Sequence, residues 1–469
     1  MKNKIIIIVL SFLMFNTFAF ADDVKKGGIE RIELSFEQAY QLMLENNNSL
    51  KAYNELIKQK QYEKKSAIGQ FLPKVILNAS YIHFSDDMTL TSSGSIKSPM
   101  GTVSFSANTL IQENNLFTAG GIAVWNIFTG GKLLSNHAAA RAKLAAADAQ
   151  YKEIEDNLTY ELVKRYYGLR LARDVVEVRK QALDTIGKHL NDAKLLEKEG
   201  FISKSERLHA EVAYSEANRE YKSALRDVNI IEEGLKTLIK AKDADLKDIY
   251  IEPSSMLFIY NDSTIDLKAM KENALVNNPK LKQLMSKKKA LDAKYHAELA
   301  NYSPTISLFA TDIVAASGLS QAVPRISVGA SANWLLFNGL SRFHDVKAAD
   351  SERKMTEFQI IDAKYNIESL VVKQYEELMK QKERYESADT SLENAKEALR
   401  TANLAFKEGV GTSLQVSDAD TMLSKIKIER LNSVYQYDII LTDLLRTNGD
   451  TQAILNYIKT SKKENFSNE

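Results

Sequence analysis

The chain has no cysteine, and it has only six prolines, 19 glycines and two tryptophans in 469 residues. Without cysteine there are no disulfides, no thiolate chemistry and no cysteine to carry a lipid anchor. The charges nearly cancel, with 62 Lys and Arg against 61 Asp and Glu, so no basic face is implied and nucleic acid is not an expected partner. The scarcity of proline and glycine predicts long, uninterrupted elements.

The N-terminus carries an export signal. Lys2 and Lys4 precede an apolar run, and small residues follow at Ala19 and Ala21. We predict a secretory signal peptide over 1–21, because the run is shorter than the roughly 20 residues that a spanning helix needs. No later segment has the pattern of a hydrophobic transmembrane helix, so in a membrane this chain would have to use strands.

The rest of the sequence consists of two copies of an internal repeat. "IELSFEQAYQLMLENNNSLKAY" matches "TIDLKAMKENALVNNPKLKQL" at an offset of 231 residues, which carries Pro73 onto Pro304. Beyond the prolines the offset is 209, which carries Trp125 onto Trp334, so the first copy holds 22 extra residues. We predict two structural repeats over 22–240 and 263–449, a connector over 241–262 and a disordered tail over 450–469.

Each copy predicts a helix, two strands, a long helix, a turn and a returning helix. The runs from Lys132 to Glu199 and from Arg342 to Glu408 would each extend about 100 Å as helices. Apolar residues recur along them every seven positions, which is typical of coiled coils. These stripes are Leu162, Leu169, Val176, Leu183 and Leu190, and then Val371, Leu378, Tyr385, Leu392 and Leu399.

Four short segments between the prolines and the long helices have the period of strands. The clearest runs from Arg325 to Leu336, where a wholly apolar face alternates with a small, polar one. About ten residues is the length of a tilted strand that crosses a bilayer, although a sandwich strand would look similar in isolation. Four strands cannot close a barrel and an open edge is not tolerated in hydrocarbon, so we expect a barrel shared between chains. For the insertion, roughly 85–115, we expect longer strand ends and an extracellular loop.

The phrase Trp-x-x-Phe-x-Gly ends each strand region. A tryptophan there suits the membrane–water interface, and the glycine permits the bend from strand to helix. The residues are Trp125, Phe128 and Gly130 in the first copy and Trp334, Phe337 and Gly339 in the second.

These features, repeated in order, resemble the TolC-like family of outer-membrane efflux proteins over about 32–449. The resemblance rests on the duplicated helix starts, on "FLPKVILNASY" and "NYSPTISLFAT", on the two exit phrases and on two Glu-Gly hairpin tips. It implies a mainly α-helical homotrimer with a long coiled-coil barrel and four strands per chain in a 12-stranded β-barrel. Such a protein lies in the outer membrane of a Gram-negative bacterium, in contact with its lipid, and extends into the periplasm.

The resemblance also implies a function. The family provides the passive exit duct of tripartite efflux pumps and of type I secretion systems. The duct docks onto a periplasmic adaptor and opens with an inner-membrane pump or ABC transporter. The implied adaptor contacts are the hairpin tips, Glu199, Gly200, Phe201, Glu408, Gly409 and Val410.

Acidic residues near the second tip are the implied channel constriction. Asp418 matches an inward-facing acidic position of the family and Asp420 is a second candidate, and three copies would form a ring that selects cations. A solvated helix residue is the alternative for Asp418. The family's Tyr and Arg lock falls on Phe406 and Gly411, so that lock is expected to be missing. The Asp of the family's exit phrase is also replaced, by Thr129 and Asn338.

No motif predicts catalysis, a cofactor or a metal site. The six histidines lack metal-ligand spacing, and "TGGK" lacks the upstream glycine of a phosphate-binding loop. Two alternatives to a channel are a secreted coiled-coil scaffold or adhesin without a pore, and a periplasmic adaptor. An adaptor would require lipoyl-like segments after its hairpin, and the sequence offers none.

Overall fold

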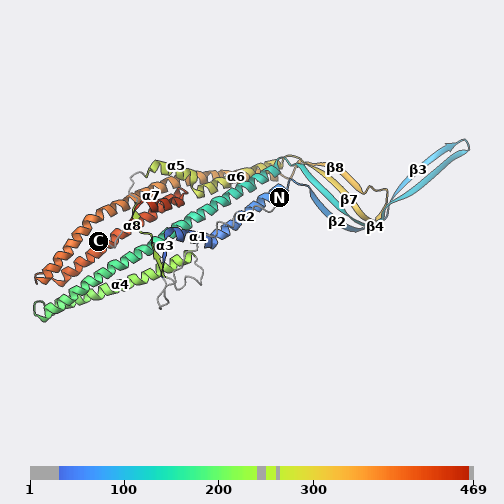
Figure 1. The fold of residues 1–469 in the computed structure, drawn as a ribbon. Coiled ribbons are helices and arrows are strands. Elements are labelled where there is room, and N and C mark those ends of the chain that lie inside the picture. Colours follow the sequence, from blue (N-terminus) through green and yellow to red (C-terminus); the bar gives the residue numbers. More distant parts are fainter. Residues whose placement is uncertain (1–30, 240–249, 260–264, 464–469) are drawn as a thin grey trace, which may run out of the picture.

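Two long helical hairpins and one large sheet make an elongated molecule in which this sheet lies at one end and the hairpin tips at the other (Figure 1). The computed structural model describes residues 31–239, 250–259 and 265–463. The predicted signal peptide, 1–21, lies outside this range, as do 241–249 and 260–262 of the predicted connector.

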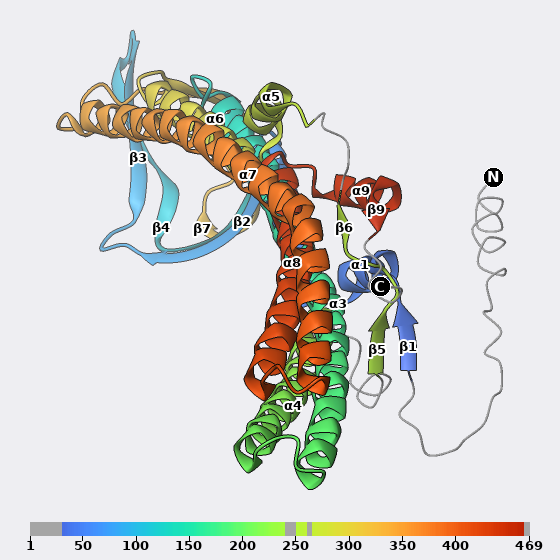
Figure 2. The same cartoon turned by 90° about the vertical axis from the view of Figure 1, so that its left-hand side faces the viewer.

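The long helices match their predicted lengths. Helices α3 (Lys132–Lys198) and α7 (Ser341–Lys407) have 67 residues each. The returning helices are α4 (Lys204–Ile239) and α8 (Ser413–Thr447), and Figure 2 shows the two hairpins side by side. The seven-residue stripe forms the seam between helices, because Leu162, Leu169, Val371 and Leu378 are fully buried. The coiled-coil prediction is confirmed.

The short helices also repeat. Helices α1 (Phe36–Asn46) and α2 (Asn48–Gly69) correspond residue for residue to α5 (Leu267–Asn277) and α6 (Pro279–Ala300). The asparagine between each pair caps the second helix: the Asn47 side chain accepts from the N–H of Ser49, and the Asn278 side chain from that of Leu281. The repeated asparagines are therefore the break between two helices.

The large sheet has five strands, four of which follow the order β2-β4-β7-β8, each antiparallel to its neighbours. They are β2 (Lys74–His83), β4 (Gly101–Phe128), β7 (Thr305–Leu319) and β8 (Ile326–Asn333). The longer strand ends expected in the insertion are present in β4, but the expected loop is mostly a further strand. Strand β3 (Met88–Ser98) pairs with the first half of β4, so the insertion is a long β-hairpin. Alternating hydroxyl-bearing and apolar residues suit a strand, and loop-like composition hid this period.

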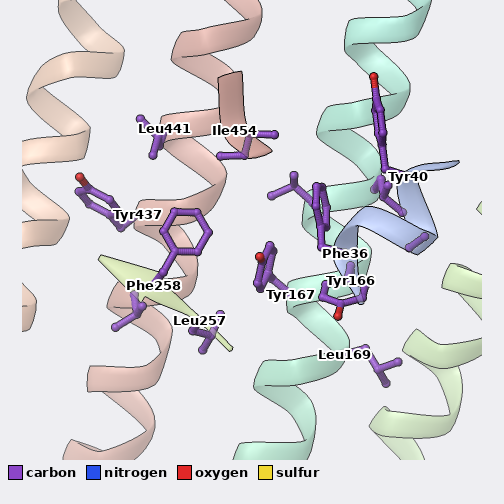
Figure 3. Close-up of a cluster of buried hydrophobic side chains, with 14 of the residues drawn as sticks. Phe36, Tyr40, Tyr166, Tyr167, Leu169, Leu257, Phe258, Tyr437, Leu441 and Ile454 are labelled. Atoms are coloured by element: carbon purple, nitrogen blue, oxygen red, sulfur yellow. The ribbon is translucent and has the colours of Figure 1, made fainter. Parts of the chain in front are cut away.

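The largest hydrophobic core lies midway along the helices. Phe36, Tyr166, Tyr167 and Phe258 pack ring against ring there, with centroids 5.2–5.7 Å apart (Figure 3). Two small sheets border this core: β1 (Arg31–Leu34) pairs with β5 (Tyr250–Pro253), and β6 (Phe258–Ile259) pairs with β9 (Lys462–Lys463). Described residues 250–259 of the connector thus join the middle of the molecule.

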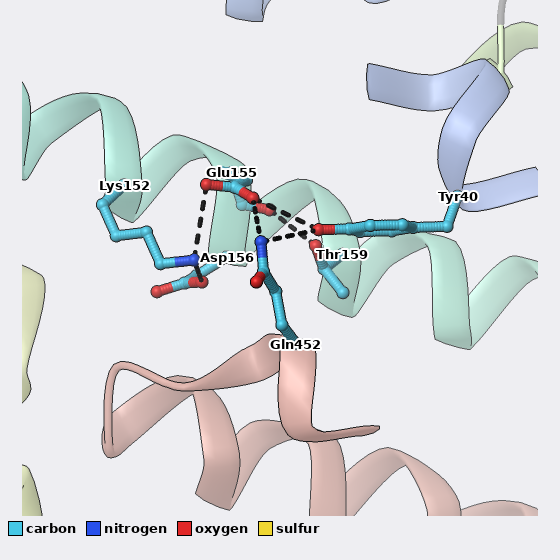
Figure 4. A network of polar contacts seen from close by, with 6 residues as sticks. All are labelled: Tyr40, Lys152, Glu155, Asp156, Thr159 and Gln452. Atoms are coloured by element: carbon cyan, nitrogen blue, oxygen red, sulfur yellow. Dashed lines mark hydrogen bonds and ion pairs between the residues drawn. The ribbon is translucent and has the colours of Figure 1, made fainter. Parts of the chain in front are cut away.

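The prediction of a disordered tail over 450–469 is wrong for most of its length. A 3-10 turn, η1 (Thr451–Ala453), leads into α9 (Ile454–Thr460), and Ile454 is fully buried. The Gln452 amide donates to Glu155 Oε1 at 2.9 Å and to the Tyr40 hydroxyl at 3.2 Å (Figure 4). These bonds attach the tail to α3 and α1, a tertiary effect that composition does not reveal. Residues 464–469 lie outside the described range.

Within the described ranges, none of the helices has the length and apolar character needed to cross a bilayer.

Candidate functional site: the strand-to-helix exits and the hairpin tips

Each tryptophan of the exit phrase ties a strand end to the helix before the sheet. The indole N–H of Trp125 donates to the Phe71 carbonyl at 2.8 Å, and that of Trp334 donates to the Tyr302 carbonyl at 3.0 Å. Both carbonyls lie two residues before the repeat's proline. The indole rings remain 44% and 60% exposed, so each offers an apolar body outward while its polar atom is satisfied. This hydrogen bond was not predicted.

The bend itself needs two left-handed residues. Gly130 and Gly131 have φ of 62° and 90°, and their counterparts Gly339 and Leu340 both have φ of 67°. A Cβ on Gly130 would lie 2.4 Å from Ser303 Cβ, whereas nothing lies within 4 Å of one on Gly339. In the first copy, Gly130 is therefore required for two reasons: its backbone conformation favours glycine, and there is no space for a Cβ. Leu340 adopts a conformation that is strained for a side chain with a Cβ.

The two exits meet at Asn301, the residue that follows the C-terminal end of α6. Lys132 donates to the Asn301 side-chain oxygen at 2.9 Å. The buried guanidinium of Arg342 donates to the carbonyls of Asn301 and Leu336, both at 2.8 Å. Phe128 and Phe337, the remaining members of the exit phrases, are exposed. The first residues of both long helices are therefore fastened to one point beside the sheet.

The hairpin tips turn on the predicted glycines. Gly200 and Gly409 have φ of 79° and 74°, and each follows a Glu-capped helix end. The next residue closes the turn in both copies: Phe201 N–H donates to the Leu196 carbonyl, and Val410 N–H to the Ala405 carbonyl. The side chains of Phe201 and Val410 are 73% and 82% exposed. Glu199 and Glu408 are exposed too, so all six tip residues lie on the surface of this chain.

A small core holds the two tips together. It contains Leu190, Ala193, Ala210, Phe406 and Val416 from all four long helices. Between the hairpins, Glu206 Oε2 accepts from the backbone N–H of Ser413 at 2.7 Å, and Lys407 approaches Asp192 at 3.3 Å. The two hairpins therefore end as one unit.

The positions to which the family's Tyr and Arg lock aligns are occupied by Phe406 and Gly411. Phe406 is 1% exposed and packs edge-on against His189, with ring centroids 4.4 Å apart. Burial lowers the pKa of His189. Gly411 leaves no room for a side chain, because a Cβ there would lie 2.9 Å from the Phe406 nitrogen. Neither position presents a group that could reach another chain.

The two acidic candidates for the constriction differ in environment. Asp418 is on an exposed part of α8, between the exposed side chains of Leu414 and Met422. Asp420 is 6% exposed and faces a cavity of about 290 Å³ between α3, α4 and α8. Burial raises the pKa of Asp420 to about 7, although the nearby charges of Lys427 and Arg179 lower it. A carboxyl enclosed within one chain cannot line a channel, so Asp420 is a poor constriction residue.

Among the described residues, no group of three or more His, Cys, Asp or Glu side chains is placed to hold a metal ion.

Comparison with known proteins shows the family to which the chain belongs. The family model described as "Outer membrane efflux protein" matches residues 39–239 and 271–450, which is most of the chain. The chain belongs to the outer membrane efflux protein family. The two matched segments follow the two repeats closely. This family member is an outer-membrane channel that serves as the exit duct of tripartite efflux systems.

Solved structures share the fold of this efflux protein at low sequence identity. The outer-membrane channel OprN is 17% identical, with a TM-score of 0.73 over 88% of this chain and 90% of that one. The Campylobacter jejuni channel CmeC is 15% identical, with a TM-score of 0.72 over 91% and 89%. The open Neisseria gonorrhoeae channel MtrE is 17% identical, with a TM-score of 0.68 over 92% and 95%. No curated protein sequence matches the chain.

Proposed function

We propose that three copies of this chain form one channel, in which each copy gives β2, β4, β7 and β8 to a closed 12-stranded barrel. The observation that carries the proposal is the pair of open edges. In the described sheet, β2 and β8 each pair on one side only, and both have about the length that crosses a bilayer. Unpaired backbone groups are not tolerated in hydrocarbon, so β8 of one copy must pair with β2 of the next.

The helices support the same assembly. Met355, Phe358, Ile361 and Tyr365 form an apolar stripe along α7, and Phe358 and Tyr365 are 71% and 69% exposed. Residues spaced three and four apart lie on one face of a helix, so this stripe is an apolar face that the described residues leave largely uncovered. In a trimer, a helix of the neighbouring copy would cover it and extend the helical barrel.

The proposed channel is passive. Its hairpin tips, with the exposed Phe201 and Val410, would dock onto a periplasmic adaptor, and an inner-membrane pump or ABC transporter would supply energy. Asp418 is the proposed constriction residue, since its carboxylate is free to face a common axis. Drug efflux and type I secretion both fit this architecture. Family membership leaves no support for the scaffold without a pore or for the adaptor.

The mass and conductance of the assembly test this proposal. Protein extracted from outer membranes in mild detergent should have the mass of three chains, and in planar bilayers it should conduct ions. Because each chain has only four of the strands, a single chain should not conduct. A folded protein with the mass of a monomer, or folded trimers that never conduct, would overturn the proposal.

Replacement of Asp418 tests the constriction. We expect Asp418→Ala to reduce the cation selectivity of single channels, since it removes three negative charges from a narrow ring. Asp418→Glu is the matched control, because it keeps the charge and should keep the selectivity. Reversal potentials measured across a salt gradient give the comparison. If Asp418→Ala, Asp418→Glu and the wild type have the same reversal potential, Asp418 is a solvated surface residue.

A further inference from the structure

The insertion of the first repeat builds a hairpin that leaves the sheet. We call residues 88–111, which comprise β3 and the first part of β4, the outer hairpin. Its register runs from Ser98↔Gly101 at the turn to Thr89↔Leu110 at the base. Strand β7 pairs with β4 only from Gln112 onward, so within the described residues the outer hairpin is two-stranded (Figure 1). A two-stranded hairpin alone in water is marginally stable at best.

The two faces of the outer hairpin differ sharply. One face carries Leu90, Ile96, Val103 and Phe105, which are 61%, 64%, 65% and 51% exposed. The Phe105 ring lies over Gly94, where an added Cβ would be 2.5 Å from the ring. The opposite face is polar throughout its middle, with Thr91, Ser93, Ser95, Ser104, Ser106 and Asn108.

Lipid cannot cover the apolar face. Strand β4 has 28 residues, which at about 3.3 Å per residue is far longer than the roughly 30 Å hydrocarbon layer. The ten residues of β2 already match one crossing, and the outer hairpin begins beyond them, on the side opposite the hairpin tips (Figure 1). It therefore stands outside the membrane, where an exposed apolar face of this kind marks a contact.

The charge of the outer hairpin favours a second copy as the partner. Lys97 is the only charged residue among 88–111. One lysine gives little attraction to the phosphates of an anionic lipid surface or to a charged protein. It also means that identical hairpins do not repel one another. A symmetric assembly brings the same surface of every copy to the same height around its axis.

We propose that the outer hairpins of the three copies pack against one another through the face made by Leu90, Ile96, Val103 and Phe105, on the extracellular side of the channel. This inference rests on the proposed trimer. Packing removes the apolar face from water and supports a hairpin that its own chain leaves without a third strand. The Ser- and Thr-rich face then points to solvent.

Introduced cysteines test the contact cleanly, because the natural chain has none. Ile96→Cys places a thiol on the apolar face, and its neighbour Ser95→Cys places one on the polar face as the matched control. Intact cells are treated with a bis-maleimide of short spacer, and the denatured protein is then separated by size. We expect Ile96→Cys to shift to the size of two linked chains and Ser95→Cys to remain at the size of one.

Val103→Cys and Ser104→Cys repeat the comparison on the partner strand, so one poorly placed thiol does not decide the result. Assembly mass is measured for every variant. Trimers in which neither Ile96→Cys nor Val103→Cys is linked would overturn the hairpin contact and leave the proposed channel intact. Equal linking on both faces would also overturn it, since that indicates random collisions. If the folded protein is a monomer, the channel proposal is overturned, and the hairpin contact with it.

Discussion

Replacement of Asp420 by Asn is expected to stabilise the protein at about pH 8 and to change its stability little at about pH 4. The Asp420 side chain is 6% exposed among α3, α4 and α8. Burial disfavours the charged form of a carboxyl group and so raises its pKa, in this case from 3.8 to about 7. Asn has nearly the same shape and carries no charge at any pH.

The sign of the effect follows from proton binding. Between about pH 4 and pH 7, folded Asp420 holds a proton that the unfolded chain has lost, so stability falls as the pH rises through this window. Above pH 7 the buried carboxylate is charged in both states. Through this shift in pKa, the wild type loses at most about 4 kcal/mol of unfolding free energy as the pH rises through the window. The Asn variant has no carboxyl group here and should not show this loss.

Other charges near Asp420 make a control necessary. Arg179 and Glu220 form an ion pair of 3.4 Å between α3 and α4, Glu216 also lines the cavity, and Lys427 lies on α8 itself. Asp418→Asn is the control, because it removes an exposed acid two residues away. Thermal unfolding in detergent, followed by circular dichroism across the pH range, gives the difference from wild type. An Asp420→Asn effect that does not grow with pH would contradict the prediction.

The sequence predicted the elements because both copies of the repeat carry the same local signals. The 67-residue helices, the glycine turns and the four strands β2, β4, β7 and β8 each follow from a period or a turn residue that appears twice. The insertion appears once, and its Ser, Thr and Gly content is typical of loops as well as exposed strands. Longer strand ends were predicted there, but the additional strand β3 was missed.

The sequence predicted where the candidate site residues lie along the chain but not which groups they contact. The exit phrase located Trp125 and Trp334 at the strand ends, but the carbonyls that accept from them belong to residues more than 30 positions earlier. The sequence alone does not distinguish Asp418 from Asp420. Only the packing of α8 against α3 and α4 shows that Asp418 is exposed and Asp420 is buried. Long-range contacts of this kind leave no local signal.

Two adjacent tyrosines in the central core should respond in opposite ways to loss of the hydroxyl group (Figure 3). The Tyr166 hydroxyl donates to the Leu34 carbonyl at 2.6 Å and accepts from the Ser255 N–H at 3.0 Å. Tyr166→Phe leaves both groups without this partner in a buried place, and we expect it to cost about 2 kcal/mol. The Tyr167 hydroxyl is buried and has no hydrogen-bond partner among the described residues, so Tyr167→Phe should leave stability unchanged or raise it slightly.

The ring of Tyr167 contributes far more than its hydroxyl. It contacts Phe36, Tyr166 and Phe258, and it is fully buried. Tyr167→Ala should therefore lose about 4 kcal/mol, because it removes a large apolar group and leaves a cavity. Unfolding midpoints of the three variants in one detergent give the order directly. If Tyr167→Phe were as damaging as Tyr166→Phe, the Tyr167 hydroxyl would have a partner after all. The buried Asp438, whose charge helps to raise the pKa of Tyr167, would then be the residue to test.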